Sequence, residues 1–320
     1  MDKGSVKLSI LGLRFMMKKI LITGGSGLVG SGLSHALSME GHSVVHLSRK
    51  ENLAARFPAY RWDPQKKQID SRALEGVTDV IHLAGSGIAD ARWTPQRKQE
   101  LMDSRTRTTE LLYEEFLKQK HFPASLIGAS AIGFYGAVTG EKIFTEADSP
   151  GKDFLAECSK RWENSYRLFQ DAGVRTIILR IGVVISGRGG ALKKLAAPVR
   201  LGAGAPLGTG KQFVPWIHEE DIFGIISYAL KSPSMNGIFN AVAPEHCTNL
   251  DLTKSIAKTL KRPLVLPAIP ALAMRILLGE MAVMLLEGSR VSCEKLLASG
   301  YSFRFSHLQD AIHQTLSESK

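Results

Sequence analysis

The segment Lys19-Ile-Leu-Ile-Thr23-Gly-Gly-Ser-Gly27-Leu-Val-Gly30 decides the fold. It starts as a short apolar strand, turns through several glycines and continues with the spacing of an amphipathic helix. Glycine permits a tight turn at Gly24, close approach of a ligand at Gly27 and close packing of helix on strand at Gly30. A pyrophosphate would then lie against the free N–H groups at the positive end of the helix. The segment predicts a dinucleotide-binding turn, and a plain glycine turn is the less favoured alternative.

Short β-branched and leucine-rich runs alternate with longer helical patterns along the rest of the chain. Helical spacing begins near Gly27, Pro95 and Asp153. The runs predicted as buried strands are 19–23, 43–47, 79–83, 124–130 and 174–180, followed by a helix over 221–230 and a strand over 237–242. This alternation is typical of an α/β fold with a Rossmann-type, doubly wound parallel sheet.

The end of the second predicted strand indicates which dinucleotide is bound. NAD-binding chains place a carboxylate there, about twenty residues after the glycine turn, to bind the ribose 2′-hydroxyl. Here Ser48 and Arg49 stand at that point, and no carboxylate occurs before Glu51. A guanidinium can donate two hydrogen bonds to one phosphate, so these residues predict NADP (NADPH) as the cofactor. A solvated basic turn is the alternative.

The chain divides into three predicted parts. Residues 1–16 form an N-terminal extension, 17–260 an NADP-binding Rossmann domain with substrate-side insertions, and 261–320 a small, mostly helical C-terminal lobe on the substrate side. Within the lobe, 269–286 is too interrupted by charge to span a membrane. The helical spacing of Ile269, Leu272, Ile276 and Leu277 predicts a buried amphipathic helix, with a membrane-surface or partner-binding helix as the alternative.

Composition excludes several classes of protein. In 320 residues, 44% hydrophobic and 22% charged side chains are ordinary globular proportions, which exclude a disordered or coiled-coil chain. Only three cysteines are present, and three scattered thiols favour a reducing, cytoplasmic location. The net charge of +11 is concentrated in part between Ala172 and His218, a span with no Asp or Glu. An anionic ligand or an outward-facing basic surface would both account for that span.

With these motifs in place, the chain resembles the extended short-chain dehydrogenase/reductase superfamily. More narrowly, it is similar to an uncharacterised subgroup of NAD(P)-dependent epimerase/dehydratase-like proteins that carry a C-terminal domain of unknown function. The stretches that carry the resemblance include Arg61-Trp-Asp-Pro64, His82-Leu-Ala-Gly85, Ser130-Ala-Ile-Gly-Phe-Tyr-Gly136 and Pro215-Trp-Ile-His218. Together, motif and resemblance predict cofactor contacts from Thr23, Gly24, Gly25, Ser26, Gly27, Leu28, Val29, Gly30, Ser48, Arg49, Leu83, Ala84, Gly85 and Arg180.

The catalytic pair of the superfamily is missing. Its members use Tyr-x-x-x-Lys, in which the lysine lowers the tyrosine pKa for acid–base work near neutral pH. None of the six tyrosines here has lysine four positions later. When Glu163 is matched to the family glutamate, Leu155 and Ser159 take the two catalytic positions. Matching Tyr135-Gly136 to the family Tyr-Gly puts Ala131 at the catalytic serine.

Two functional hypotheses follow. The first is an NADP-dependent oxidoreductase or epimerase acting on a carbonyl or nucleotide-sugar-like substrate, with Tyr135 and Ser130 as catalytic candidates and Lys160 or His218 as a proton relay. Arg92, Trp93 and His218 are its substrate-binding candidates. The second is an NADPH-binding sensor without turnover, which the missing Tyr-x-x-x-Lys favours.

The remaining expectations concern partners. We expect a small-molecule substrate, anionic if the basic span faces it, and neither a nucleic-acid nor a membrane partner. No metal site is expected, because no His-Glu-x-x-His or Cys-x-x-Cys spacing occurs. The oligomeric state is left open.

Overall fold

The core of the molecule is an eight-stranded sheet in the order β11-β8-β6-β5-β1-β2-β3-β4. The computed structural model describes residues 17–317, so the predicted extension over residues 1–16 lies outside the described residues. All neighbouring strands in the sheet are parallel except β3 and β4. The predicted Rossmann-type, doubly wound fold is therefore confirmed.

The six predicted strands are present within two residues of their predicted bounds. The sheet consists of β1 (Lys19–Thr23), β2 (Ser43–Ser48), β3 (Ala59–Asp63), β4 (Gln68–Ile69), β5 (Asp79–His82), β6 (Ser125–Ala131), β8 (Arg175–Ile181) and β11 (Gly237–Ala241). The edge hairpin of β3 and β4 was not predicted. In β3 only Trp62 is buried, so the strand lacks the continuous apolar run that identifies the central strands.

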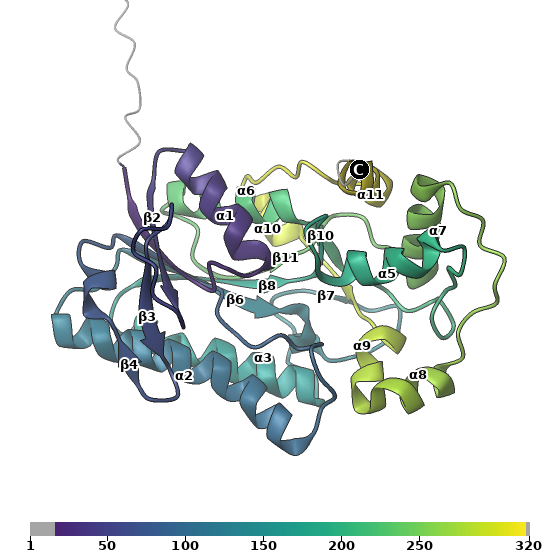
Figure 1. Cartoon of the computed structure of the whole chain (residues 1–320), viewed down its shortest axis with the longest axis horizontal. Coiled ribbons are helices and arrows are strands. Elements are labelled where there is room, and N and C mark those ends of the chain that lie inside the picture. Colours follow the sequence, from purple (N-terminus) through teal and green to yellow (C-terminus); the bar gives the residue numbers. More distant parts are fainter. Residues whose placement is uncertain (1–16, 318–320) are drawn as a thin grey trace, which may run out of the picture.

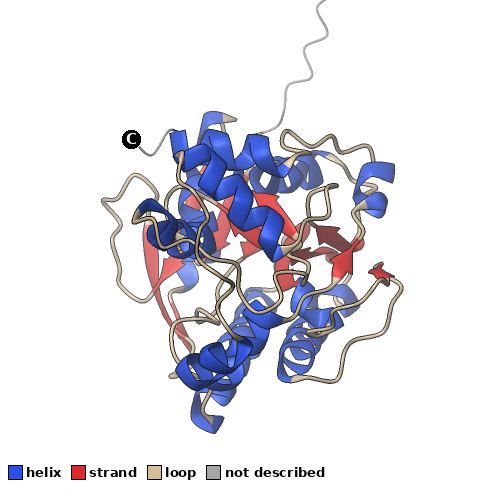
Figure 2. Ribbon diagram, turned by 90° about the vertical axis from the view of Figure 1, so that its right-hand side faces the viewer, coloured by secondary structure: helices blue, strands red, loops and turns tan. Residues whose placement is uncertain are grey.

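Helices cover both faces of the sheet, as Figures 1 and 2 show. On one face, α1 (Leu28–Met39) and α6 (Glu219–Lys231) pack on Ile20 and Ile22 of β1. On the other face, α2 (Pro95–Gln119), α3 (Phe154–Ser165) and α4 (Arg167–Asp171) belong to the cluster that contains Leu21. Side chains of a strand alternate between faces, so an uninterrupted apolar strand is buried from both sides.

A third hydrophobic cluster lies beyond the sheet and joins segments far apart in sequence. It includes residues from β9 (Val183–Ile185), β10 (Trp216–His218), α5 (Gly190–Arg200), α7 (Asn249–Leu260) and α11 (Leu308–Ser317). The remaining short elements are η1 (Ser71–Leu74), η2 (Ile132–Tyr135), β7 (Ile143–Phe144), α8 (Ala271–Leu278), η3 (Gly279–Ala282), α9 (Val283–Leu286), β12 (Arg290–Val291) and α10 (Glu294–Ala298). The cluster contains residues from both sides of the predicted boundary at 260, which stays a prediction.

The expectation of a buried helix over 269–286 was wrong. The segment is split into α8, η3 and α9, and Gly279 ends α8 with φ of 62°. Leu272, Ile276 and Leu277 are 70%, 71% and 66% exposed, while Met274 is the residue that packs inward. Helical spacing shows which residues share a face, but it does not show whether anything covers that face.

The described part of the chain contains no helix long and apolar enough to cross a membrane.

Candidate functional site

The candidate site lies where the strand order of the sheet reverses direction. Strands β1 and β5 are adjacent, with Thr23 opposite His82, while the chain leaves β1 toward β2 on one side and β5 toward β6 on the other. In doubly wound sheets the crevice at the carboxyl ends of two such strands is the ligand-binding position. The structure therefore brings the predicted cofactor contacts 23–30 and 83–85 to one edge of the sheet.

Three glycines of the turn occupy positions that a side chain could not share without displacement. Gly24 has φ of 72°, and a Cβ there would lie 3.0 Å from the backbone of Leu83. A Cβ on Gly25 would meet the His46 ring at 2.5 Å, and one on Gly30 would lie 2.3 Å from the Gly24 carbonyl oxygen. The turn is thus pressed against β5, β2 and its own helix.

The first turn of α1 is open to an anion. Gly27 is its N-cap, and among the described residues this end has neither a side-chain cap nor an acidic residue in its first turn. The first N–H groups of a helix lack intrahelical acceptors and carry the positive end of the helix dipole. This end of α1 therefore suits a pyrophosphate.

A buried histidine ties the turn to two other elements. His82 Nδ1 lies 2.7 Å from Thr23 Oγ1, and its Nε2 lies 3.2 Å from the hydroxyls of both Thr108 and Thr109 on α2. Thr23 Oγ1 also accepts a hydrogen bond from the Ala84 N–H. Burial lowers the pKa of His82 to about 3, so the imidazole is neutral near pH 7. The sequence motif His82-Leu-Ala-Gly85 contains this residue, but its spacing does not show the hydroxyl partners.

The end of β2 presents a cation toward solvent. Arg49 is exposed and makes no hydrogen bond or ion pair with another described residue, while the Ser48 hydroxyl accepts a 3.4 Å hydrogen bond from the Lys50 N–H. Just before them, His46 Nε2 lies 2.7 Å from Ser34 Oγ of α1, under Gly25. Arg49 therefore has no partner among the described residues and follows β2, the strand whose His46 contacts Gly25 of the glycine turn.

The acid-free span 172–218 is dispersed over the molecule. Arg188 is the member that contacts α1: it donates to the Leu28 carbonyl at 3.0 Å and to Ser31 Oγ, and it pairs with Glu219. Arg175 instead donates to backbone carbonyls of residues 229–235. The remaining cations of the span, apart from Arg180, are exposed: Lys193, Lys194, Arg200 and Lys211. The span is therefore not one continuous basic surface facing the crevice.

The two catalytic candidates lie together in a closed polar cluster. The Ser130 hydroxyl donates to Glu163 at 2.6 Å, and Arg180 forms two 2.8 Å hydrogen bonds with the same carboxylate. The Tyr135 hydroxyl donates to Asn240 at 2.6 Å and accepts from Arg180 at 2.9 Å. Tyr135 is 1% exposed and Arg180 2% exposed, and burial raises the pKa of Tyr135 to about 12. Every one of these polar groups already has a partner inside the protein.

The helix that carries the family's catalytic pair shows no phenol or ammonium at those positions. A Cβ on Gly133 would lie 3.2 Å from Leu155 Cβ and 3.6 Å from Ser159 Oγ, so both residues face η2. Lys160, the next residue, is exposed.

The three predicted substrate-binding residues do not lie in one pocket wall, and each forms hydrogen bonds within the protein. Arg92 donates to the carbonyls of Ile276 and Leu277 at the end of α8. Trp93 is buried and donates its indole N–H to the Ile88 carbonyl at 2.9 Å. These two residues lie in the loop after β5.

His218 is the N-cap of α6. Its Nδ1 accepts from the Glu220 N–H at 3.3 Å, and its Nε2 lies 3.0 Å from Thr315 Oγ1. Burial lowers the pKa of His218 to about 4.

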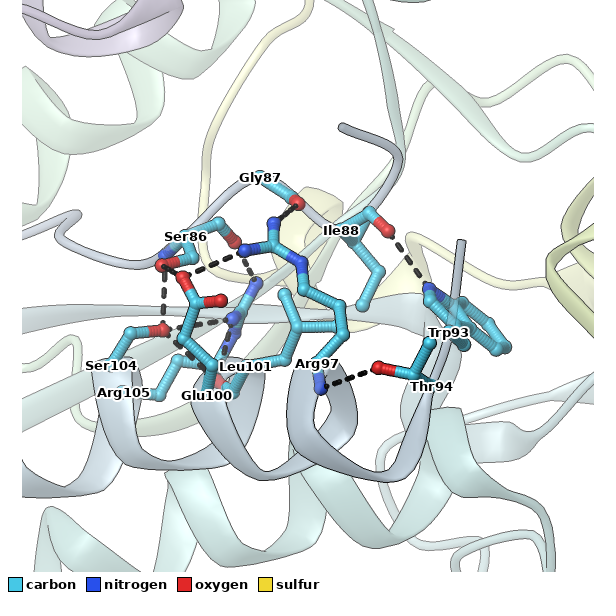
Figure 3. A network of polar contacts seen from close by, with 10 residues as sticks. All are labelled: Ser86, Gly87, Ile88, Trp93, Thr94, Arg97, Glu100, Leu101, Ser104 and Arg105. Atoms are coloured by element: carbon cyan, nitrogen blue, oxygen red, sulfur yellow. Dashed lines mark hydrogen bonds and ion pairs between the residues drawn. The ribbon is translucent and has the colours of Figure 1, made fainter. Parts of the chain in front are cut away.

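The loop after β5 is fixed by two arginines that the sequence did not single out (Figure 3). Arg105 donates to the carbonyls of Ser86 and Leu101 at 3.1 and 2.8 Å. Its guanidinium also lies 4.9 Å from the Trp162 ring centroid. Arg97 donates to the Gly87 carbonyl at 2.6 Å. No described carboxylate forms an ion pair with Arg105, and burial lowers the pKa of its guanidinium. Arg97 and Arg105 lie on α2, outside the loop in sequence, so sequence spacing does not indicate that they fix it.

Metal ligands do not gather at this edge. Among residues 17–317, no group of three or more His, Cys, Asp and Glu side chains is placed to hold a metal ion.

Comparison with known proteins agrees with this geometry. The model of the NAD dependent epimerase/dehydratase family matches residues 20–241, which include the glycine turn and the strands that flank it. The chain belongs to this family. A domain of unknown function (DUF1731) matches residues 269–315 of this epimerase-family protein, within the predicted C-terminal lobe.

Relatives cover nearly the whole chain. The epimerase family protein MT2273 of Mycobacterium tuberculosis is 35% identical over 294 residues, which are 92% of this chain and 96% of the relative. A crystal structure of the human epimerase family protein SDR39U1 with NADPH superimposes with a TM-score of 0.84 at 30% identity, covering 93% of this chain and 99% of that one. The Thermus thermophilus UDP-glucose 4-epimerase with NAD has a TM-score of 0.76 at 23% identity, covers 94% and 98% of the two chains, and shares the fold.

We predict that the Arg180–Glu163 pair stabilises this epimerase-family protein far more than an exposed pair on the same helix. Glu163→Gln leaves the buried Arg180 charge without its counter-ion and should lower the free energy of unfolding by about 3–5 kcal/mol. The control is Glu157→Gln, which removes the exposed pair with Arg161 and should cost less than about 1 kcal/mol. Denaturant unfolding of both variants measures the difference, and equal small losses would contradict it.

We also predict a loss of stability in acid that depends on His82. Its pKa is about 3 in the folded chain and near 6.5 when unfolded, so between these values only the unfolded chain takes up the proton. Stability is complete above about pH 6.5 and should fall on acidification by about 1.4 kcal/mol per pH unit from this group. His82→Asn should flatten the slope measured by denaturant unfolding, whereas the exposed control His121→Gln should not. An unchanged slope in His82→Asn would refute the assignment.

Proposed function

We propose that this epimerase-family protein binds NADP(H) and acts as an oxidoreductase or epimerase on a carbonyl or nucleotide-sugar-like substrate. The observation that carries the proposal is the glycine turn at the reversal of strand order, next to an exposed Arg49 without a protein partner. The NADPH in the structure of the human relative supports the choice of cofactor.

The residues that would hold the cofactor fit its chemistry. The open end of α1 suits the pyrophosphate, because its N–H groups and dipole favour an anion. Arg49 and Ser48 offer a guanidinium and a hydroxyl to a 2′-phosphate at the end of β2. Leu83–Gly85 flank the turn at the end of β5, where Ala84 is fixed through Thr23. When bound, the nicotinamide supplies a hydride donor or acceptor.

A sensor that binds NADPH without turnover is the second candidate. It is favoured by the polar cluster, in which Ser130 and Tyr135 already have buried partners, and by Leu155 and Ser159 at the family's catalytic positions. Catalytic roles for Tyr135 and Ser130 require the cluster to open toward a substrate. Substrate contacts from Arg92, Trp93 and His218, and a cytoplasmic location, likewise stay predictions.

Replacing Arg49 tests the cofactor assignment. Arg49→Ala removes charge-assisted hydrogen bonds to the 2′-phosphate and should weaken NADPH binding about 10- to 100-fold. The affinity for NADH, which lacks that phosphate, should stay unchanged. Calorimetric titration of both cofactors measures this, with the neighbouring exposed cation in Lys50→Ala as control. An equal loss for NADH and NADPH would count against a 2′-phosphate contact.

Turnover separates the two candidates. We expect turnover in a screen of carbonyl and nucleotide-sugar substrates. An oxidoreductase would consume NADPH, measured by the absorbance of the reduced nicotinamide, whereas an epimerase would return the hydride to its substrate and yield an epimerised product without net loss of that absorbance. A fall of about a hundredfold in kcat for Tyr135→Phe, at unchanged NADPH affinity, would support a proton-donating phenol. Tight NADPH binding with neither NADPH consumption nor an epimerised product would identify a sensor.

A further inference from the structure

The C-terminal lobe exposes an apolar surface that the described fold does not cover. It is formed by residues 261–278, here called the apolar ridge, and includes α8 and the extended segment before it. Val265, Leu272, Ile276 and Leu277 are 73%, 70%, 71% and 66% exposed, and Leu266 is 46% exposed. Scattered exposed leucines are ordinary, but large apolar side chains clustered in one short segment mark an interaction surface.

The outward face of α8 is apolar throughout. Leu272, Ala273, Ile276 and Leu277 cover an arc of about 140° at 100° per residue, and all four are exposed. On the opposite side Met274 packs in a cluster with Leu207 and Ala282. The helix is therefore held against the molecule by one side and presents the other to its surroundings.

The α8 part of the ridge is anchored to the body at both ends. Ile269 exchanges backbone hydrogen bonds with the 206–208 loop, donating to Pro206 at 2.8 Å and accepting from Gly208 at 2.9 Å. At the other end, Arg92 donates to the carbonyls of Ile276 and Leu277. These hydrogen bonds fix the orientation of α8, so its exposed face stays directed away from the body.

Along the chain, the ridge and the helix before it carry charge of one sign, while Arg275 on α8 lines a surface pocket with Glu280 and Glu287. From Leu252 to Gly279 there is no Asp or Glu, and the cations Lys254, Lys258, Lys261, Arg262 and Arg275 are all exposed. The next acid, Glu280, is paired with Lys98. Apolar side chains bordered by cations are the pattern of helices that lie in the interface of an anionic bilayer.

In contrast to the expectation from sequence that there is no membrane partner, we propose that the apolar ridge docks this protein on an anionic membrane surface. The apolar side chains would enter the boundary between headgroups and acyl chains, and each nearby cation would strengthen binding about fivefold.

Vesicle flotation of the full chain tests the proposal. We expect the protein to float with vesicles of three parts phosphatidylcholine to one part phosphatidylglycerol, and not with phosphatidylcholine alone. The Leu272→Ser/Ile276→Ser variant should lower the partition coefficient at least about tenfold. Lys261→Gln/Arg262→Gln should lower it about tenfold or more, and added salt should weaken wild-type binding.

The controls separate a membrane from other occupants. Leu117→Ser, which removes an exposed leucine of α2, should leave flotation unchanged, and unaltered NADPH affinity would show that every variant is folded. Flotation that is absent, equal with neutral vesicles, or unaffected by Leu272→Ser/Ile276→Ser would overturn the proposal. A concentration-dependent dimer in sedimentation velocity that these substitutions abolish would assign the ridge to a second copy instead.

Discussion

The contact between the glycine turn and the end of β5 is the constraint on which the rest of the site depends. A Cβ on Gly24 would lie 3.0 Å from the Leu83 backbone and would strain the positive φ of 72°, and Thr23 bridges His82 and the Ala84 N–H. The parallel pairing of β1 and β5 brings these groups level, and α2 joins through the hydroxyls that meet His82. The open end of α1 can face a pyrophosphate because strand, turn and helix are fixed relative to one another.

The polar cluster around Arg180 shows how the same fold can lack its family's catalytic pair. In low dielectric an unpaired guanidinium is very costly, so Arg180 needs Glu163, and Glu163 in turn takes the Ser130 hydroxyl. A third Arg180 donor, on Nη1, meets the Tyr135 hydroxyl, which donates its own proton to Asn240. The polar groups of the cluster are hydrogen-bonded to one another although position 159 is Ser rather than Lys and position 155 is Leu rather than Tyr. The residues that look catalytic in sequence are therefore also the ones that complete a buried network.

The sequence predicted what depends on local pattern and missed what depends on packing. Buried parallel strands and the glycine turn are local, so β1, β2, β5, β6, β8 and β11 could be predicted within two residues. Arg105 could not be identified as a residue that fixes the loop after β5, because its partners are backbone carbonyls that any sequence supplies. The exposure of Leu272 and Ile276 could not be predicted either, because helical periodicity is the same whether the apolar face is buried or exposed.

The loop after β5 joins the cofactor crevice to the C-terminal lobe. Arg97 and Arg105 hold its beginning on α2, and Arg92 in its later part holds the carbonyl end of α8. Carbonyls at the end of a helix carry negative partial charge, so a guanidinium stabilises α8 even though the helix has only two turns. The crevice at the end of β5 and the exposed apolar ridge are thus both in contact with one segment. A shift of this loop would therefore alter its contacts both at the crevice and at α8.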